Sequence, residues 1–187
     1  MERGKNVYLA PTAVLGHPGK KEKKELREGK FQDLAPVKLM DDVIVRDHSV
    51  IYAGVQLGDG VEVGHHVLIR EGSRVGKRTV IGSGTIVEAH CVIGDDVSIQ
   101  SSVFLATGTE VMDRVFLGPM VCVINDRYMD SYIQRCTISE GAKVGAGSIL
   151  FPGITVGENS LVGAGSLVTR DIPENTRAYG RPAVPRP

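Results

Sequence analysis

A six-residue repeat runs without interruption from Val43 to Ile124 and constrains the fold more than any other feature of this 187-residue chain. Every sixth residue is aliphatic, and the residue two places before it is β-branched or small. The aliphatic positions are Val45, Ile51, Leu57, Val63, Ile69, Val75, Ile81, Val87, Ile93, Ile99, Leu105, Val111, Leu117 and Val123. A period of six matches neither an α-helix nor the alternation of an ordinary strand. It predicts a β-solenoid, in which short coils stack around one continuous core.

The same register is visible on both sides of this stretch. Leu9 lies in an opening half-coil, and after a break the period returns with Ile138, Val144, Leu150, Val156, Val162 and Val168. We therefore predict one all-β domain over residues 1–187, with a charged insert at about 16–38 and a protruding loop at about 125–135. The insert is expected to be a solvated loop or short helix, or else a segment that closes over a substrate. The loop is expected to carry function, as loops on rigid scaffolds commonly do.

Glycine follows the aliphatic residue in many repeats, as in Val63-Gly64, Val75-Gly76, Ile81-Gly82 and Ile93-Gly94. This pattern resembles the hexapeptide-repeat acyltransferases over nearly the whole chain apart from the insert. The resemblance implies a left-handed parallel β-helix with three repeats in each triangular coil. It also implies a homotrimer that uses acetyl-CoA (coenzyme A) as co-substrate.

The composition narrows the range of partners and locations. The chain has 22 Lys and Arg and 22 Asp and Glu, and this balance does not indicate binding to nucleic acid or to an anionic membrane. No apolar run approaches the ~20 residues of a membrane span, and no signal-peptide core is visible near the N-terminus. Cys91 and Cys136 fall at small inward positions and should be reduced core residues. We expect a cytoplasmic protein.

One outward-facing column of the predicted solenoid is apolar. The residues just before the core positions form three columns at a spacing of eighteen, one column for each face. One column is mostly polar and one is mixed, whereas the third consists of Val50, Leu68, Ile86, Phe104 and Cys122. An exposed apolar stripe of this kind usually marks an interface. We expect subunits to meet there, unless the insert covers the stripe.

The corner after this apolar face departs from the aliphatic-Gly rule. Its successive turns are Tyr52-Ala53-Gly54, Arg70-Glu71-Gly72, Glu88-Ala89-His90, Ala106-Thr107-Gly108 and Ile124-Asn125-Asp126. His90 and Asp126 are two whole coils apart, about 10 Å along one column, with Gly108 expected to leave a gap between them. Glu88 can pair with Arg70 one coil away. His90 is either a proton acceptor, as imidazole can be near neutral pH, or an ordinary solvated corner residue.

A second histidine cluster raises the question of a metal. His65 and His66 are adjacent, and His48 lies one coil earlier. The γ-class carbonic anhydrases share the expected fold and place two zinc histidines five residues apart. In this chain Arg70 occupies the fifth position after His65, and a catalytic zinc generally needs three protein ligands. We therefore expect no metal.

Shorter segments resemble the nucleotide-linked amino-sugar N-acetyltransferases within this family. They are residues 64–72, 99–102 and 116–121, the last leading into the loop at 125–128. The resemblance implies catalytic roles for His90, Asn125 and Glu88, with His90 as base or amine-orienting group and Glu88 positioning it. It implies substrate-binding roles for Asp126, Tyr128, Arg70 and Gln100. Some relatives lack a protein base, and in that case His90 only binds.

The C-terminal repeats resemble the coenzyme A end of the family. Gly145-Ala146-Gly147 and Gly163-Ala164-Gly165 are eighteen residues apart, so they should stack on one edge and leave bare backbone for a pantetheine arm. The alternative is that these small residues only form tight corners. The expected coenzyme-binding residues are Gly145, Ala146, Gly163, Ala164, Thr169, Arg170, Arg181 and Pro182.

These features together predict an acetyl-CoA-dependent N-acetyltransferase acting on the amino group of an amino sugar that is nucleotide-linked. The first alternative is an O-acetyltransferase for serine or a simple sugar. Galactoside and maltose O-acetyltransferases carry a catalytic histidine in the corresponding loop, whereas residues 125–135 contain none. The second alternative is a non-catalytic β-helix that serves as an assembly scaffold.

Overall fold

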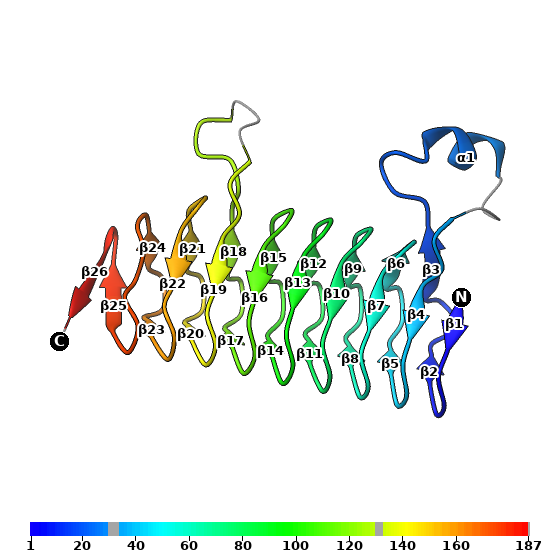
Figure 1. The fold of residues 1–187 in the computed structure, drawn as a ribbon, viewed down its shortest axis with the longest axis horizontal. Helices are drawn as coiled ribbons and strands as arrows, with labels where there is room; N and C mark the ends of the chain where they lie inside the picture. Colours follow the sequence, from blue (N-terminus) through cyan, green and yellow to red (C-terminus); the bar gives the residue numbers. More distant parts are fainter. Residues whose placement is uncertain (30–33, 130–132, 187) are drawn as a thin grey trace.

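A computed structural model describes residues 1–29, 34–129 and 133–186, so parts of the predicted insert and loop lie outside the described residues. The chain winds into a left-handed parallel β-helix, and each coil adds one short strand to each of three sheets (Figure 1). Strands of successive coils pair in parallel, so that Val75 lies between Leu57 and Ile93. The predicted fold is confirmed.

The three sheets, here called A, B and C, form the three faces of the solenoid. Sheet A comprises β1 Glu2–Arg3, β4 Lys38–Leu39, β7 Gln56–Leu57, β10 Arg74–Val75, β13 Val92–Ile93, β16 Glu110–Val111, β19 Thr137–Ile138 and β22 Thr155–Val156. Sheet B comprises β2 Tyr8–Leu9, β5 Ile44–Val45, β8 Glu62–Val63, β11 Val80–Ile81, β14 Ser98–Ile99, β17 Phe116–Leu117, β20 Lys143–Val144, β23 Leu161–Val162, β25 Arg177–Gly180 and β26 Ala183–Arg186. Sheet C comprises β3 Val14–His17, β6 Val50–Tyr52, β9 Leu68–Ile69, β12 Ile86–Val87, β15 Phe104–Leu105, β18 Cys122–Val123, β21 Ile149–Leu150 and β24 Leu167–Val168.

The core consists of the aliphatic side chains that the repeat predicts. Between Val43 and Ile124, none of these sixth-position residues is more than 4% exposed. The small positions that alternate with them are also buried, and their hydroxyls are satisfied between coils. Ser49 Oγ donates to the Gly64 carbonyl at 2.8 Å and accepts from the Val67 amide at 3.1 Å. Among the residues that the structure describes, no buried side-chain nitrogen or oxygen lacks a hydrogen-bond partner, as stable interiors require.

The first coil is complete, and the expected opening half-coil was too short. Strand β1 pairs with β4, with Arg3 opposite Leu39. Arg3 stands where the repeat has an aliphatic residue, and its guanidinium donates to the carbonyl of Val7. A hydrophobic pattern could not reveal this strand. At the other end, β25 and β26 form an antiparallel hairpin that closes sheet B. No helix in the described part of the chain is long and apolar enough to span a membrane.

Two projections leave the solenoid at the same corner, the turns that connect sheet C to sheet A, here called the C–A corner. The insert leaves after β3, contains the short helix α1 Lys23–Glu28, and returns at β4. The loop leaves after β18 and returns at β19. Figure 1 shows both on one edge of the solenoid, with several coils between them.

The predicted apolar column lies on the outer side of sheet C and is half-buried in the single chain. Hydrogen bonds hold the ends of the insert at the C–A corner instead. The Ala53 amide donates to the His17 carbonyl and the Gly54 amide donates to the Ala35 carbonyl, each at 2.9 Å. These contacts do not support the alternative that the insert covers the apolar column.

Candidate active site

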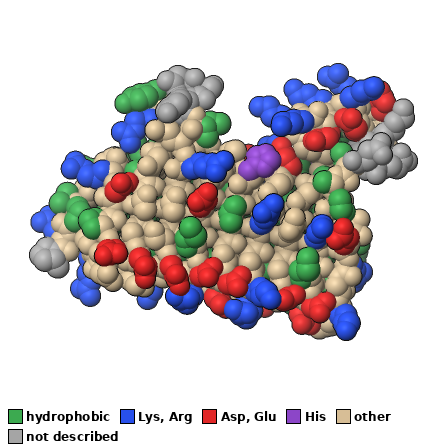
Figure 2. Space-filling model, in the orientation of Figure 1, with side chains coloured by type: hydrophobic (Ala, Val, Ile, Leu, Met, Phe, Trp, Pro, Cys, Tyr) green, Lys and Arg blue, Asp and Glu red, His purple; other side chains and the backbone are tan. Residues whose placement is uncertain are grey.

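A groove of about 670 Å³ lies on the C–A corner between the two projections. Its base is formed by four successive corner turns, around Ala53, Glu71, His90 and Thr107. The insert contributes Lys20, Lys21, Glu22, Glu25, Leu34 and Ala35, and the loop contributes Ile133. Figure 2 shows the hollow between the projections on the upper edge. The groove thus combines corner residues with side chains from both projections.

Arg70 is the centre of a polar network at the base of the groove. Its guanidinium donates to both carboxylate oxygens of Glu71, at 2.9 and 3.1 Å, and to Glu88 at 3.4 Å. The pairing of Arg70 with Glu88 was predicted, and Glu71 is the closer partner. The hydrogen bond to Glu71 raises the pKa of Arg70. Burial alone would raise the pKa of Glu71, but bonds from Arg70 and the Lys20 amide outweigh it and lower that pKa.

Two aromatic rings, those of Tyr52 and His17, pack in series against the Arg70 guanidinium. The guanidinium carbon lies 5.1 Å from the centre of the Tyr52 ring, a cation–π distance. The ring of Tyr52 in turn lies 4.7 Å from that of His17, the last residue before the insert. The start of the insert is therefore connected through Tyr52 to Arg70. This stack orients the network that lies beside His90.

The His90 side chain rests against Gly72, one coil earlier. A Cβ placed on Gly72 would overlap His90 Nδ1 and lie 2.9 Å from Cε1. Only a glycine leaves room for the ring in this position. His90 is exposed, and its backbone has a φ of 60°. Neither ring nitrogen makes a hydrogen bond to any described residue, so packing against Gly72 takes the place of an orienting partner.

Gly72→Ala should therefore displace the His90 imidazole. Both Gly72 and Gly84 have a φ of +70°, so alanine brings a similar backbone strain of about 1–2 kcal/mol at either position. A Cβ at Gly84 would lie 3.5 Å from Ser102 Oγ, an ordinary contact. We expect the imidazole NMR signals of His90 to move in Gly72→Ala and to stay in Gly84→Ala, with similar losses of stability. Unmoved His90 signals in both variants would contradict this packing.

The structure shows where the residues predicted on the loop side lie. Asn125 lies at the base of the loop, where its Nδ2 donates to the Thr107 carbonyl at 3.4 Å. The Asp126 carboxylate accepts from the Tyr128 amide at 3.1 Å. The gap expected at Gly108 is absent, because the Arg135 side chain lies over this glycine, within 3.5 Å of where a Cβ would stand. Sequence spacing could not show that the returning end of the loop folds back there.

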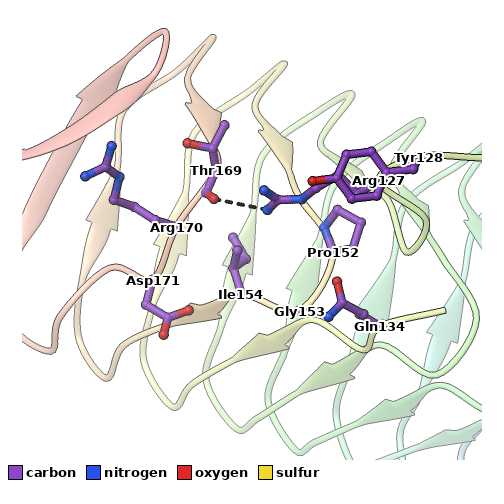
Figure 3. Close-up of a pocket in the computed structure, with 9 residues that line it drawn as sticks. All are labelled: Arg127, Tyr128, Gln134, Pro152, Gly153, Ile154, Thr169, Arg170 and Asp171. Atoms are coloured by element: carbon purple, nitrogen blue, oxygen red, sulfur yellow. Dashed lines mark hydrogen bonds between the residues drawn. The ribbon is translucent and has the colours of Figure 1, made fainter. Parts of the chain in front are cut away.

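A second cavity, of about 520 Å³, lies on the far side of the loop (Figure 3). It is lined by Tyr128 and by Thr169 and Arg170 of the last coils. Arg127 crosses it, donating to the Thr169 carbonyl at 3.3 Å, with its guanidinium 5.3 Å from the centre of the Phe151 ring. Tyr128 therefore lines a cavity other than the His90 groove.

The remaining predicted residues lie on the corner between sheets B and C, here called the B–C corner. Gly145-Ala146 and Gly163-Ala164 stack there, with the Gly165 amide donating to the Ala146 carbonyl at 2.8 Å. The stacking of these segments was predicted and is confirmed. The turn of the β25–β26 hairpin, with Arg181 and Pro182, adjoins them through a bond from the Gly180 amide to Ser166 Oγ. Gln100 is on this same corner and donates to Ser98 Oγ.

The structure therefore divides the predicted site residues between two edges. His90, Glu88, Arg70, Asn125 and Asp126 belong to the C–A corner. So do Thr169 and Arg170, although they were predicted to bind the same coenzyme as Ala146 and Ala164. Sheet C lies between the two corners. Within one chain, the width of sheet C therefore separates the two groups of predicted residues.

The other candidate groups show no catalytic arrangement. His48 and His66 stack with ring centres 4.9 Å apart, and His65 lies 3.7 Å from Asp47. Within residues 1–29, 34–129 and 133–186, no cluster of His, Cys, Asp or Glu could hold a metal ion. Burial raises the pKa of the Cys91 and Cys136 thiols to about 12 in each case. Such thiols are poor nucleophiles at neutral pH.

Several groove residues were missed by sequence reasoning. Lys20 and Lys21 were assigned only to a charged insert, and Glu71 was not recognised as the main partner of Arg70. Gly72 could have been found, because it precedes His90 by one coil and therefore stacks beneath it. The lysines carried no such signal, because the insert has no repeat register.

Comparison with known proteins identifies the repeat. Residues 71–107 match the family described as bacterial transferase hexapeptide (six repeats), and residues 136–170 match the hexapeptide repeat of succinyl-transferase. The predicted resemblance to hexapeptide-repeat transferases is confirmed.

Three individual proteins illustrate the similarity. A galactoside O-acetyltransferase of Lactococcus lactis is 40% identical over 53 residues, 28% of this chain and 26% of that protein. A dTDP-3-amino-3,6-dideoxy-alpha-D-galactopyranose 3-N-acetyltransferase of Aneurinibacillus thermoaerophilus is 43% identical over 49 residues, 26% of each chain. Each match thus spans about a quarter of the relative. A crystal structure of a Bacillus cereus protein assigned as an acetyltransferase has a TM-score of 0.58 and 25% identity, over 94% of this chain and 83% of that one.

Proposed function

We propose that this hexapeptide-repeat chain is an acetyl-CoA-dependent N-acetyltransferase whose acceptor is the amino group of a nucleotide-linked amino sugar. The observation that carries the proposal is the exposed His90 imidazole, seated on Gly72 in a groove between two projections. The comparisons support acetyl transfer to a sugar as the general class. The choice of nitrogen as the acceptor atom and the nucleotide are our inference.

His90 would act as the general base. During transfer the nitrogen of the neutral acceptor amine bonds to the acetyl carbon and the thioester C–S bond breaks. The proton that the nitrogen gives up ends on the departing coenzyme sulfur. The imidazole can take this proton, because neither of its nitrogens is committed to a described residue and it faces the groove. General-base catalysis of this kind typically contributes 10²–10⁴-fold to the rate, an order-of-magnitude range. Holding both reactants in one cleft contributes as well.

The charge at the base of the groove supports an amine acceptor. Glu71 and Glu88 share the single guanidinium of Arg70, so this part of the groove carries an excess of negative charge. An amine in solution is mainly a cation, which this charge attracts, and it loses one proton to the solvent before its nitrogen can attack the acetyl carbon. A neutral hydroxyl acceptor would gain nothing from it.

The B–C corner provides a fitting edge for the coenzyme. Ala164 is exposed, and a Cβ placed on Gly147 or Gly165 would meet no atom within 4 Å. The space beside this edge is therefore open. A pantetheine arm is narrow and carries amides, so it can lie along exposed main chain. Thr169 and Arg170, on the other corner, would reach the coenzyme from a neighbouring subunit.

A homotrimer would bring these two edges together. Sheet C lies between the B–C and C–A corners, and its outer column is apolar and half-buried in the single chain. If subunits pack through this face, the C–A corner of one approaches the B–C corner of the next. We also place the protein in the cytoplasm, because Cys91, Cys122 and Cys136 are all free thiols.

Phe104→Asp tests the assembly. Phe104 is an outward residue of the apolar column, and a carboxylate there would be desolvated at an interface without a partner. We expect monomers or aggregates by light scattering. Val92→Asp is the matched control, because Val92 is an outward residue of sheet A and is 47% exposed. If Phe104→Asp keeps the oligomeric mass and activity of the unchanged protein, the interface lies elsewhere.

Product analysis tests the reaction itself. Incubation with acetyl-CoA and a panel of nucleotide amino sugars should give one product heavier by an acetyl group in mass spectrometry. The similarity to the galactoside O-acetyltransferase favours an O-acceptor as the second candidate. Hydroxylamine separates the two, because it cleaves O-acetyl esters under conditions in which amides persist. A non-catalytic scaffold would give no product and would show no thermal shift with coenzyme A.

A further inference from the structure

We propose that Lys20 and Lys21 of the insert form a binding site for the phosphate groups of the acceptor. This inference rests on the proposed function and assigns a part of the acceptor to residues outside the repeat. The insert would then set the substrate class, by selecting amines that also carry a phosphate or diphosphate.

Both ends of the insert are attached to the corner turns beside the groove. The Lys20 amide donates to Glu71 Oε1 at 3.1 Å, and the Gly54 amide donates to the Ala35 carbonyl at 2.9 Å. Gly19 is buried against Glu71, and a Cβ there would lie 2.7 Å from the Glu71 carboxyl carbon. Both ends of the insert are therefore attached to the corner turns that lead to His90. Lys20 and Lys21 are positioned by these contacts at the side of the groove.

Among the described lysines and arginines that line the groove, Lys20 and Lys21 are the two whose side chains have no ionic partner. Arg70 also lines the groove, but it is bonded to Glu71 and Glu88. Neither lysine side chain forms an ion pair or hydrogen bond with any described residue. Glu22 and Glu25 line the same side of the groove. They can accept hydrogen bonds from sugar hydroxyls.

The groove therefore has two regions that differ in their charged groups. An excess of negative charge lies near His90, where Glu71 and Glu88 share Arg70. On the insert side Lys20, Lys21, Glu22 and Glu25 together carry no net charge, and the ammonium groups of the two lysines are the available partners for a phosphate. An acceptor with an ammonium group at one end and a phosphate or diphosphate at the other matches both regions. Charge-assisted bonds to phosphate oxygens are among the stronger hydrogen bonds in proteins.

The test uses the full chain saturated with coenzyme A, so that the coenzyme's own phosphates cannot occupy the site under study. Inorganic pyrophosphate is then titrated by calorimetry. Lys20→Glu/Lys21→Glu should weaken its binding by about tenfold or more, since each charged hydrogen bond is worth about that factor. Lys23→Glu/Lys24→Glu is the matched control, with the same charge change on α1 at positions that do not line the groove. It should stay within about twofold of the unchanged protein.

Coenzyme affinity and kinetics complete the test. Coenzyme A should bind both double variants as it binds the unchanged protein, and the Lys20/Lys21 variant should raise KM for the acceptor with little change in kcat. The inference is overturned if pyrophosphate does not bind, if it binds the Lys20/Lys21 variant normally, or if that variant loses coenzyme affinity instead. Failure of the unchanged protein to bind coenzyme A would count against the proposed function, whereas the pyrophosphate comparison could still be made.

Discussion

His90→Asn should lower kcat by about 10²–10⁴-fold, the usual contribution of a general base. The backbone of His90 has a φ of 60°, which asparagine tolerates better than most residues, so the corner should keep its shape. The asparagine amide can donate and accept hydrogen bonds but cannot take the proton that the acceptor nitrogen releases. Steady-state kinetics with saturating acetyl-CoA measure the effect.

Asp42→Asn is the matched control for this substitution. Asp42 is also exposed and has a φ of 59°, but it lies in the turn between β4 and β5, away from both the C–A and the B–C corners. We expect kcat within about twofold of the unchanged enzyme, as for a surface substitution outside the site. If His90→Asn loses less than about tenfold in kcat while KM for the acceptor rises, His90 binds the acceptor and is not its base.

The solenoid could be predicted from the sequence because its core is built from repeats that stack along a single axis. Each coil contacts mainly the coil before and the coil after, so burial repeats at a fixed spacing. A residue such as Leu105 is therefore buried for the same reason as Val87 and Val123, one coil on either side. The first strand escaped prediction because Arg3 replaces the aliphatic residue and satisfies its polar group on the Val7 carbonyl.

The site was harder to predict because it combines repeat positions with segments that have no repeat. Spacing alone correctly placed Arg70 beside Glu88 and stacked Ala146 beside Ala164. The choice of Glu71 as the stronger partner of Arg70 depends on side-chain conformation, which spacing does not determine. The positions of Lys20 and Arg135 depend on how the insert and the loop fold back on the corner. Neither segment has a periodicity from which this could be read.

Ala164→Trp should weaken acetyl-CoA binding by about 5- to 150-fold, the equivalent of the ~1–3 kcal/mol that a steric clash in a packed site usually costs. Ala164 is exposed on the B–C corner and stacks beside Ala146, with open space next to Gly147 and Gly165. An indole at this position would fill the path proposed for the pantetheine arm. Because the side chain points away from the core, the fold and the oligomer should survive. Calorimetric titration with acetyl-CoA measures the loss.

Glu158→Trp separates this effect from the mere presence of an indole. Glu158 lies in the turn between β22 and β23, so it is on a different corner of the same coil, and it is exposed. Because this substitution removes a negative charge, it should not weaken the binding of an anionic ligand. The affinity for acetyl-CoA should therefore be retained. Comparing the two tryptophan variants also shows whether the glycines and alanines of the B–C corner bind the coenzyme or only form tight turns. If Ala164→Trp is folded, oligomeric and binds acetyl-CoA as well as Glu158→Trp does, the glycines and alanines only make tight corners and the coenzyme lies on another edge.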